Sequence, residues 1–269
     1  MPISKNAKQR NDHILRSSKA EVIVHDLSEQ RVDIFSDYSD RTIVALHDAL
    51  IVHADAPASA RGASAEAIAK TPTPYARLLQ YTSGSTRAPA GVIMTHRNVI
   101  ANVKQVFDDY MEHRDGIPPQ DITMVSWLPF YHDMGLIVGV FIPMVLGRPA
   151  VLMSPVAFMQ KPSRWMQQLG LHPSAFTAAP NFAFELAVKR TSDEDLAGKD
   201  LSTVKVMING AERVHGSTVR RFNQRFAQFG LPDSAMRPSY GLAEATVYVA
   251  ASAGGQPPTA VRFDFEKLA

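Results

Sequence analysis

Residues 78–98 read LLQYTSGSTRAPAGVIMTHRN, and the fold assignment starts from the pattern of this stretch. An apolar run over 78–81 leads into a loop of small and hydroxyl residues, and a second apolar run follows over 92–94. Thr95 comes next and is a residue type that begins helices well. We therefore expect a strand, a loop, a second strand and a helix in that order.

The loop between the two apolar runs has the composition of an anion-binding loop. Its hydroxyl groups and backbone N–H groups would face the anion, and glycine permits close approach without a Cβ clash. Phosphate is the anion that we expect there, although the Gly-x-x-x-x-Gly-Lys-[Ser/Thr] loop of P-loop NTPases is absent from the sequence. An ordinary polar hairpin loop is the alternative. The residues concerned are Thr82, Ser83, Gly84, Ser85 and Thr86.

Strand and helix patterns alternate along the chain after Pro74. Alternation of this kind predicts an α/β fold, with layered and mainly parallel sheets flanked by helices. In such sheets ligands bind beyond the carboxyl ends of the strands. We expect strands over 122–128, 150–153, 174–178 and 204–208, and helices over 95–110, 135–146, 162–168, 180–189 and 219–229, with Gly147 and Gly230 ending two of the helices.

The N-terminal part of the chain has a weaker pattern. Residues 1–19 are polar and are expected to begin as a helix, 21–24 resemble a strand, and 41–53 favour a strand over a helix. Residues 55–72 are rich in Ala and Ser, which is typical of a linker or a loosely packed surface segment.

Composition excludes several classes of protein. The 269-residue chain carries 28 Lys and Arg against 26 Asp and Glu, without a basic block, so nucleic-acid binding has little support. It contains no cysteine, which excludes disulfides and thiolate metal sites and fits a cytoplasmic location. The start of the chain lacks the apolar core of a signal peptide. The longest apolar run, 136–146, is about half of the ~20 residues that a membrane span needs.

The segment WLPFYHDMGL, residues 127–136, follows an expected strand and precedes an apolar helix. His132 is a candidate to gate substrate at the mouth of a pocket. A metal site is disfavoured, because no other His, Asp or Glu stands nearby at ligand spacing. The plainer alternative is a helix start, with Asp133 near the positive end of the helix dipole.

The segment VMINGAERV, residues 206–214, is a buried strand that ends in Asn-Gly-Ala-Glu. We expect Asn209 and Gly210 to turn sharply and to expose backbone groups to the edge of a flat ligand. A simple turn between a strand and a helix is the alternative.

The segment RPSYGLAEAT, residues 237–246, places an aromatic residue, a glycine and a carboxylate after a short extended stretch. Tyr240 is suited to stack on a nucleobase. Glu244 is suited to hold Mg2+, a hard cation that takes oxygen ligands and bridges phosphates. The alternative is a surface turn with a glutamate at the start of a helix.

Together and in this order, the four segments resemble the adenylate-forming superfamily of acyl-CoA synthetases, nonribosomal-peptide adenylation domains and luciferases. YTSGST resembles its phosphate loop, LPFYHDMG its substrate-side motif, NGAE its adenine-side segment, and YGLAE its Tyr-Gly-x-Thr-Glu motif. The likeness covers residues 75–250, about two-thirds of the chain, and it implies an α/β fold that is part of the large N-terminal domain of such an enzyme.

Departures from the superfamily pattern narrow the resemblance. The phosphate loop usually continues Gly-x-Pro-Lys-Gly, whereas residues 87–91 read RAPAG, so Ala90 stands where the lysine is usual and Arg87 is the candidate to replace its charge. Ala243 stands where the later motif has threonine. Together with LMSPVAF and TAAPNFAFELAVKR, these segments look like the fatty acyl-AMP ligases.

That resemblance implies ATP-dependent activation of a long-chain fatty acid to an acyl-adenylate, with release of pyrophosphate. ATP and Mg2+ would be the cofactors, and the acyl group would pass to the carrier protein of a lipid or polyketide synthase. His132 and Glu244 are the implied catalytic residues, and Glu244 is also the implied metal ligand. The nucleotide-binding residues would be Thr82, Ser83, Gly84, Ser85, Thr86, Asn209, Gly210, Ala211, Glu212, Tyr240, Gly241 and Leu242.

Two other functions remain open, a long-chain acyl-CoA ligase and a catalytically inactive fragment that binds a nucleotide or a lipid. The domain division expected from the resemblance is a partial N-terminal region over 1–74, an AMP-binding core over 75–250 and the start of an insertion over 251–269. The ribose-binding motif and the small C-terminal domain with its catalytic lysine are not found in the sequence. We therefore expect this chain alone to be a poor catalyst.

Overall fold

The computed structural model describes residues 9, 12–14, 16, 22–25, 42–45, 77–82, 90–111, 115–261 and 263–264. The chain divides into two compact units, Met1–Thr95 and His96–Ala269, and each unit is described here by itself. Residues 46–76 lie outside the described part, which includes the expected linker, so the domain boundary at residue 74 stays a prediction.

The N-terminal unit contains two pairs of strands. Strand β1 (Val22–His25) pairs in parallel with β2 (Thr42–Ala45), which confirms the strands expected there. Strand β3 (Arg77–Tyr81) pairs antiparallel with β4 (Gly91–Thr95). The strands expected on either side of the Ser/Thr/Gly loop are thus present and form a hairpin.

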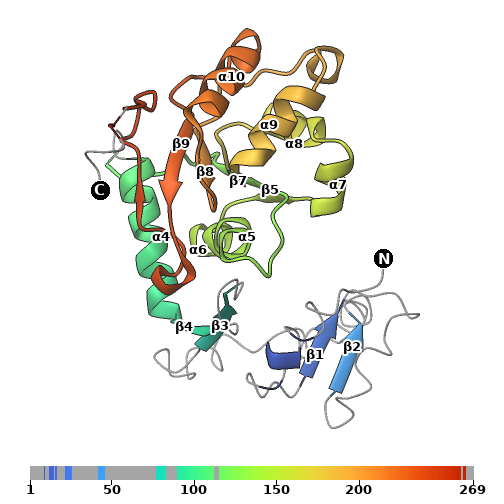
Figure 1. Ribbon diagram of the computed structural model, residues 1–269, viewed down its shortest axis with the longest axis vertical. Helices are drawn as coiled ribbons and strands as arrows, with labels where there is room; N and C mark the ends of the chain where they lie inside the picture. Colours follow the sequence, from blue (N-terminus) through green and yellow to red (C-terminus); the bar gives the residue numbers. More distant parts are fainter. Residues whose placement is uncertain are drawn as a thin grey trace. The chain divides into compact units, whose positions relative to one another are not determined.

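The C-terminal unit is built on one six-stranded sheet in the order β10-β9-β8-β7-β5-β6 (Figure 1). All neighbouring strands are parallel except β10, which is antiparallel to β9. The mainly parallel α/β fold predicted from the alternating pattern is therefore confirmed. The strands are β5 (Thr123–Ser126), β6 (Ala150–Leu152), β7 (Ala175–Pro180), β8 (Val206–Gly210), β9 (Met236–Tyr240) and β10 (Ala250–Ala251).

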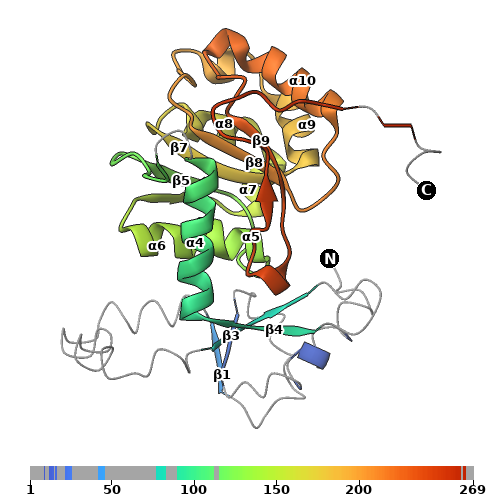
Figure 2. The same ribbon diagram turned by 90° about the vertical axis from the view of Figure 1, so that its left-hand side faces the viewer.

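Helices cover both faces of this sheet (Figures 1 and 2). The helical segments are α4 (His96–Tyr110), α5 (Asp133–Leu136), η5 (Ile137–Phe141), α6 (Ile142–Leu146), α7 (Pro155–Gln160), α8 (Ser163–Leu169), α9 (Asn181–Arg190), η6 (Glu194–Leu196), α10 (Gly216–Phe226), η7 (Ala227–Phe229) and η8 (Ala243–Ala245).

Two consecutive residues of β7 show how the layers are assigned. The ring of Phe176 packs against Phe107 of α4, with 5.7 Å between the ring centroids. The hydroxyl of Thr177 accepts a hydrogen bond from the indole N–H of Trp165 in α8 at 3.0 Å. Because successive side chains of a strand point to opposite faces, α4 and α8 lie on opposite sides of the sheet. Aromatic rings continue the core from Trp165 through Phe184 of α9, and each such pair adds about 0.5–1.5 kcal/mol beyond its buried area.

The apolar segment expected as one helix over 135–146 is helical, but it is not a uniform α-helix. It begins at Asp133 and passes through a π-helical turn, η5, before α6. It ends as expected at Gly147, whose φ of 61° is left-handed. Helix α7 was not predicted, because its six residues are too short to show a helical period. In the described part of the chain no helix combines the length and the apolar character that a membrane crossing needs.

The order of the strands defines a switch point in the sheet. From β5 the chain adds β6 on one side, then returns to place β7 on the other side of β5 and continues outward through β8 and β9. The switch point therefore lies between β5 and β7. In open α/β sheets ligands bind outside the carboxyl ends of the strands at this point, so a ligand site is expected there.

Candidate functional site

The three polar segments singled out in the sequence of the C-terminal unit all follow strands of the same sheet. The segment 127–136 follows β5, while the segments 206–214 and 237–246 contain the ends of β8 and β9 and the residues that follow them. Because β5, β7, β8 and β9 are parallel, their carboxyl ends lie on one edge. The sheet thus gathers the three segments, which are separate in sequence, at the edge where a ligand is expected.

At the end of β5, His132 is the N-terminal cap of α5. Its Nδ1 lies 2.7 Å from Oδ1 of Asp133, and the backbone N–H of Met134 donates to Asp133 Oδ1 at 2.7 Å and reaches His132 Nδ1 at 3.2 Å. The Met134 N–H is thus shared between Nδ1 of His132 and Oδ1 of Asp133. These contacts hold the imidazole at the start of its own helix.

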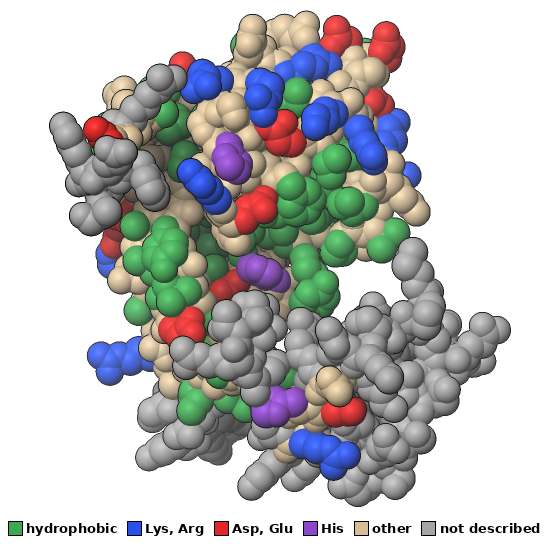
Figure 3. Space-filling model, viewed as in Figure 1, with side chains coloured by type: hydrophobic (Ala, Val, Ile, Leu, Met, Phe, Trp, Pro, Cys, Tyr) green, Lys and Arg blue, Asp and Glu red, His purple; other side chains and the backbone are tan. Residues whose placement is uncertain are grey.

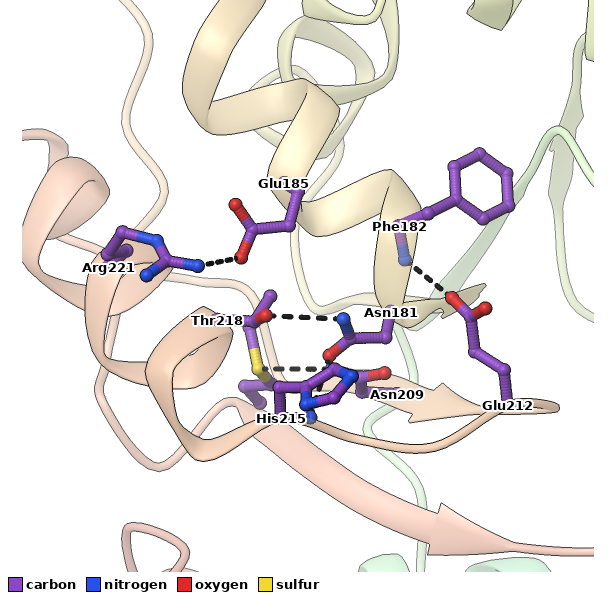
Figure 4. A network of polar contacts seen from close by, with 9 residues as sticks. Asn181, Phe182, Glu185, Asn209, Glu212, His215, Thr218 and Arg221 are labelled. Carbon is purple, nitrogen blue, oxygen red and sulfur yellow. Dashed lines mark hydrogen bonds and ion pairs between the residues drawn. The ribbon is translucent and has the colours of Figure 1, made fainter.

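At the end of β7, the buried side chain of Asn181 joins three elements (Figure 4). Its Nδ2 donates to the hydroxyl of Thr218 in α10 at 3.2 Å. Its Oδ1 accepts from the backbone N–H of His215 at 3.1 Å and from Nδ2 of Asn209 at 3.4 Å. The network ties the ends of β7 and β8 to the start of α10, so the turn after β8 is held in one position.

The turn after β8 begins later than we expected. Asn209 and Gly210 were predicted to form it, but both are the last residues of β8 and both are buried. The turn begins at Ala211, which has a φ of 63°. A central strand explains the difference, since pairing of Asn209 with Ala179 and Pro238, and of Gly210 with Pro180, extends β8 to its last residue. Of Asn209, Gly210, Ala211 and Glu212, only Ala211 and Glu212 are exposed.

The carboxylate of Glu212 already has a role within the fold. Its Oε1 accepts a hydrogen bond from the backbone N–H of Phe182 at 2.6 Å (Figure 4). Phe182 stands in the first turn of α9, whose N–H groups have no partners within the helix. A negative charge there also interacts favourably with the helix dipole. Glu212 therefore fixes the turn after β8 against α9, and Ala211 beside it is exposed.

The segment after β9 carries the side chains that are most open to a ligand. The Tyr240 ring is 63% exposed, and Gly241 and Glu244 are exposed as well. Among the described residues no hydrogen bond or ion pair engages the Glu244 carboxylate. Leu242 is half-buried and precedes η8, the short helix on which Glu244 stands. An aromatic ring and an unpaired carboxylate are thus offered together at the carboxyl edge of the sheet.

The expected phosphate loop belongs to the other unit and is described only at its two ends. The backbone N–H of Thr82 donates to the carbonyl of Ala90 at 3.0 Å, and the Thr82 hydroxyl accepts from the N–H of Ala90 at 3.3 Å. These bonds close the hairpin beneath the loop. Ser83, Gly84, Ser85, Thr86 and Arg87 lie outside the described residues, so their roles stay predictions.

Basic side chains gather on α9 and α10 at one end of the C-terminal unit. Lys189, Arg190, Arg220 and Arg221 are exposed on α9 and α10, and Figure 3 shows Lys and Arg side chains at that end of the unit. A hydrogen bond with Thr218, together with Arg221, lowers the pKa of the Glu185 carboxyl on the same two helices.

Nowhere in the described part of the chain do three or more His, Asp or Glu side chains gather as a metal site.

Sequence reasoning missed two contributors to this edge. Asn181 is not among the site residues expected from the sequence, yet it is the centre of the network. Phe182 is 41% exposed and lies beside the switch point, with its ring 6.2 Å from that of Trp127. The available signal was position, since both residues immediately follow a strand whose carboxyl end faces the site.

Comparison with known proteins agrees with this arrangement. The family model described as AMP-binding enzyme matches residues 4–263. The chain is 56% identical over 195 residues to the long-chain-fatty-acid–AMP ligase FadD28 of Mycobacterium tuberculosis, covering 72% of the chain and 34% of the relative. It is also 56% identical over 195 residues to the 4-hydroxyphenylalkanoate adenylyltransferase of Mycobacterium tuberculosis, covering 72% of the chain and 31% of the relative.

A solved structure shows the same fold at lower identity. The fatty acyl-adenylate ligase from L. pneumophila, in complex with acyl adenylate and pyrophosphate, matches with a TM-score of 0.72 and 30% identity, over 92% of this chain and 41% of that one. The chain spans about a third of the length of the curated relatives that it matches. Because the family model extends over nearly the whole sequence, the chain belongs to the AMP-binding enzyme family.

Proposed function

We propose that this chain carries the nucleotide- and acyl-binding part of a fatty acyl-AMP ligase. Such an enzyme forms an acyl-adenylate from ATP and a long-chain fatty acid and releases pyrophosphate. The observation that supports this most is the carboxyl edge of the sheet, which bears His132 after β5 and Tyr240 with Glu244 at the end of β9. The similarity to FadD28 and to the L. pneumophila ligase supports the same reaction.

The structure favours an apolar acid over an amino acid as the substrate. An amino acid would need a carboxylate to hold its ammonium group, and Asp133 was the one candidate. The Asp133 carboxylate is engaged by His132 and the Met134 N–H, and the Asn181 amide is buried in the network of Figure 4. Exposed aromatic side chains flank the same edge, where each buried CH2 of an acyl chain would gain ~0.8 kcal/mol. They are Phe130, Tyr131 and Phe182.

Adenylation of a carboxylate needs alignment and charge neutralisation more than a protein nucleophile. His132 would contact the acyl carboxylate, and Tyr240 with Ala211 would face the adenine. Glu244 fits Mg2+, because it is an exposed carboxylate without a partner among the described residues, and Mg2+ commonly uses one or two carboxylates plus substrate phosphates. When bound, Mg2+ would neutralise charge on the phosphates. Transfer of the acyl group to a carrier protein would follow.

Binding of stable acyl-adenylate analogues tests the substrate class without requiring turnover. Isothermal titration of the chain with acyl-sulfamoyl adenosines should give tighter binding for C12–C18 acyl groups than for a phenylalanyl group. A 4-hydroxyphenylalkanoyl analogue belongs in the same series, since the name of one relative points to that acid. Tighter binding of the aminoacyl analogue would show that the acyl assignment is wrong.

The role of Glu244 is tested by Glu244→Gln. In the unchanged chain, Mg2+ should strengthen ATP binding relative to EDTA. Loss of one charged contact should reduce that gain roughly tenfold or more, because contacts to charged groups are worth about 1.5–3 kcal/mol. Glu194→Gln removes an exposed carboxylate of η6 and is the matched control, which should leave the gain unchanged. A full Mg2+ gain in Glu244→Gln would exclude the assigned role.

A further inference from the structure

The residues that follow β9 form a closed loop that carries Glu244. We call residues 241–249 the Glu244 loop. Strands β9 and β10 pair antiparallel on either side of it, with Tyr240 opposite Ala250. The N–H of Val249 donates to the carbonyl of Tyr240 at 3.1 Å and closes the loop at its base. The position of Glu244 is therefore set by the path of the backbone between Tyr240 and Val249.

That path contains an unfavourable backbone conformation. Thr246 has a φ of 73° and a ψ of −59°, the angles of the rare γ-turn, and a β-branched residue is an outlier there. Such a conformation persists only when the surrounding structure holds it, and such strain concentrates at functional sites. A group outside the loop must therefore hold Thr246 in this conformation.

The side chain of Asn102, from the middle of α4, binds both backbone groups of Tyr248. Its Nδ2 donates to the Tyr248 carbonyl at 3.0 Å, and the Tyr248 N–H donates to its Oδ1 at 3.0 Å. Asn102 is 4% exposed and Tyr248 is 8% exposed. The amide thus replaces the neighbouring strand that a backbone pair would otherwise need, two residues after the strained Thr246. Without it, both groups would be buried and unpaired, which is costly.

Helix α4 makes further contacts on both sides of the loop (Figures 1 and 2). The Tyr248 hydroxyl donates to the carboxylate of Asp109, and the rings of Tyr110 and Tyr248 lie 5.5 Å apart. On the other side, the Tyr110 hydroxyl is hydrogen-bonded to Ser239, the residue before Tyr240. One rigid helix therefore anchors the chain before and after the Glu244 loop.

We propose that Asn102 is a positioning residue for the nucleotide site: it holds the strained turn of the Glu244 loop and so places the Glu244 carboxylate for Mg2+ and the phosphates. The proposal rests on the proposed function, because it assigns a purpose to the position of Glu244. It predicts that loss of Asn102 releases the loop and weakens Mg2+-dependent nucleotide binding while the rest of the fold stays intact.

Hydrogen exchange tests the structural half of the proposal without any ligand. In Asn102→Ala, amides of the Glu244 loop should exchange roughly tenfold faster or more, because two buried bonds that hold the loop are lost. Amides of α4 and of β7 should keep their rates. Gln105→Ala is the matched control, since Gln105 is the exposed α4 residue that accepts the other Asn102 hydrogen bond and makes no bond to the loop. Its loop should exchange as in the unchanged chain.

Nucleotide binding tests the functional half. The ratio of ATP affinity with Mg2+ to that with EDTA should fall in Asn102→Ala as it falls in Glu244→Gln, and it should be retained in Gln105→Ala. Where Asn102→Ala does not fold, Asn102→Asp provides the test, because it keeps an acceptor for the Tyr248 N–H and removes the donor to the Tyr248 carbonyl. That variant should show a smaller change in the same loop amides and in the same ratio.

The outcomes separate the two proposals. An unchanged ratio in Glu244→Gln overturns the proposed Mg2+ role and this inference with it. A reduced ratio in Glu244→Gln with an unchanged ratio in Asn102→Ala overturns the inference alone. Faster exchange across α4 and the sheet in Asn102→Ala would mean that Asn102 serves general stability, and this too would overturn the inference.

Discussion

Gly241 is the residue at which the Glu244 loop depends most directly on the absence of a side chain. A Cβ at this position would lie 1.7 Å from the carbonyl oxygen of Val247, and backbone of that kind cannot move aside cheaply. We expect Gly241→Ala to force the loop open, to lower the free energy of unfolding by about 1–3 kcal/mol, and to abolish the Mg2+-dependent gain in ATP binding. Calorimetry and titration would measure the two effects.

Gly147 provides the comparison for that substitution, because its glycine is required for a different reason. A Cβ there would meet nothing within 4 Å, but its φ is 61°. Gly147→Ala should therefore cost about 1–2 kcal/mol from the left-handed backbone alone and leave ATP binding intact. Equal effects of the two substitutions on ATP binding would contradict the steric argument for Gly241.

Helix α9 is an element whose N-terminus is bound by a carboxylate from the turn after β8. We expect Glu212→Ala to destabilise the unit by about 1 kcal/mol, since it removes the acceptor for the Phe182 N–H and a charge from the helix N-terminus. Urea unfolding would measure the loss. Arg221→Ala breaks the exposed ion pair with Glu185 between α10 and α9 and should cost less, about 0–1 kcal/mol. A larger loss in Arg221→Ala would argue against the cap.

At the level of single elements, some features could be predicted from the sequence and others could not. The helix ends at Gly147 and Gly230 were predictable, because the left-handed backbone conformation that ends many helices is usually adopted by glycine. The late turn at Ala211 was not, because Asn-Gly favours a turn and only pairing with β7 and β9 keeps it extended. The contact between Asn102 and Tyr248 joins residues 146 positions apart, and no local pattern carries such information.

Across the whole C-terminal unit, carboxylates with a lowered pKa make stability depend on pH. A hydrogen bond with Lys161, together with the Ser192 N–H, lowers the pKa of Asp195 below its ordinary 3.8. Its contribution is complete above 3.8, the value of the unfolded chain, and is lost as the pH falls through the lower folded value. We expect the urea midpoint to fall on acidification below about pH 4, less steeply in Asp195→Asn. Equal slopes would rule out Asp195 as a contributor.

For the molecule as a whole, the order of most elements and the edge of the sheet at which we propose the site followed from the sequence. Periodicity and the rule for parallel sheets are sufficient for that. The identity of the groups that remain available to a ligand did not follow. Asn209 and Glu212 looked as open as Tyr240 in the sequence, yet the fold buries Asn209 and pairs the exposed Glu212 with the Phe182 N–H, while Tyr240 is 63% exposed.

The π-helical turn between α5 and α6 also fixes the rotational phase of everything after it. A turn of this kind contains one more residue than an α-helical turn, so η5 acts as a one-residue insertion inside an otherwise regular helix. If Ile137–Phe141 formed regular α-helix with the same number of residues, the side chains of α6 would be rotated by about 100° around the axis. Ile142, now fully buried, would exchange direction with neighbours such as Met144, which is 70% exposed. In this segment the number of residues, as much as their type, determines which surface the helix shows.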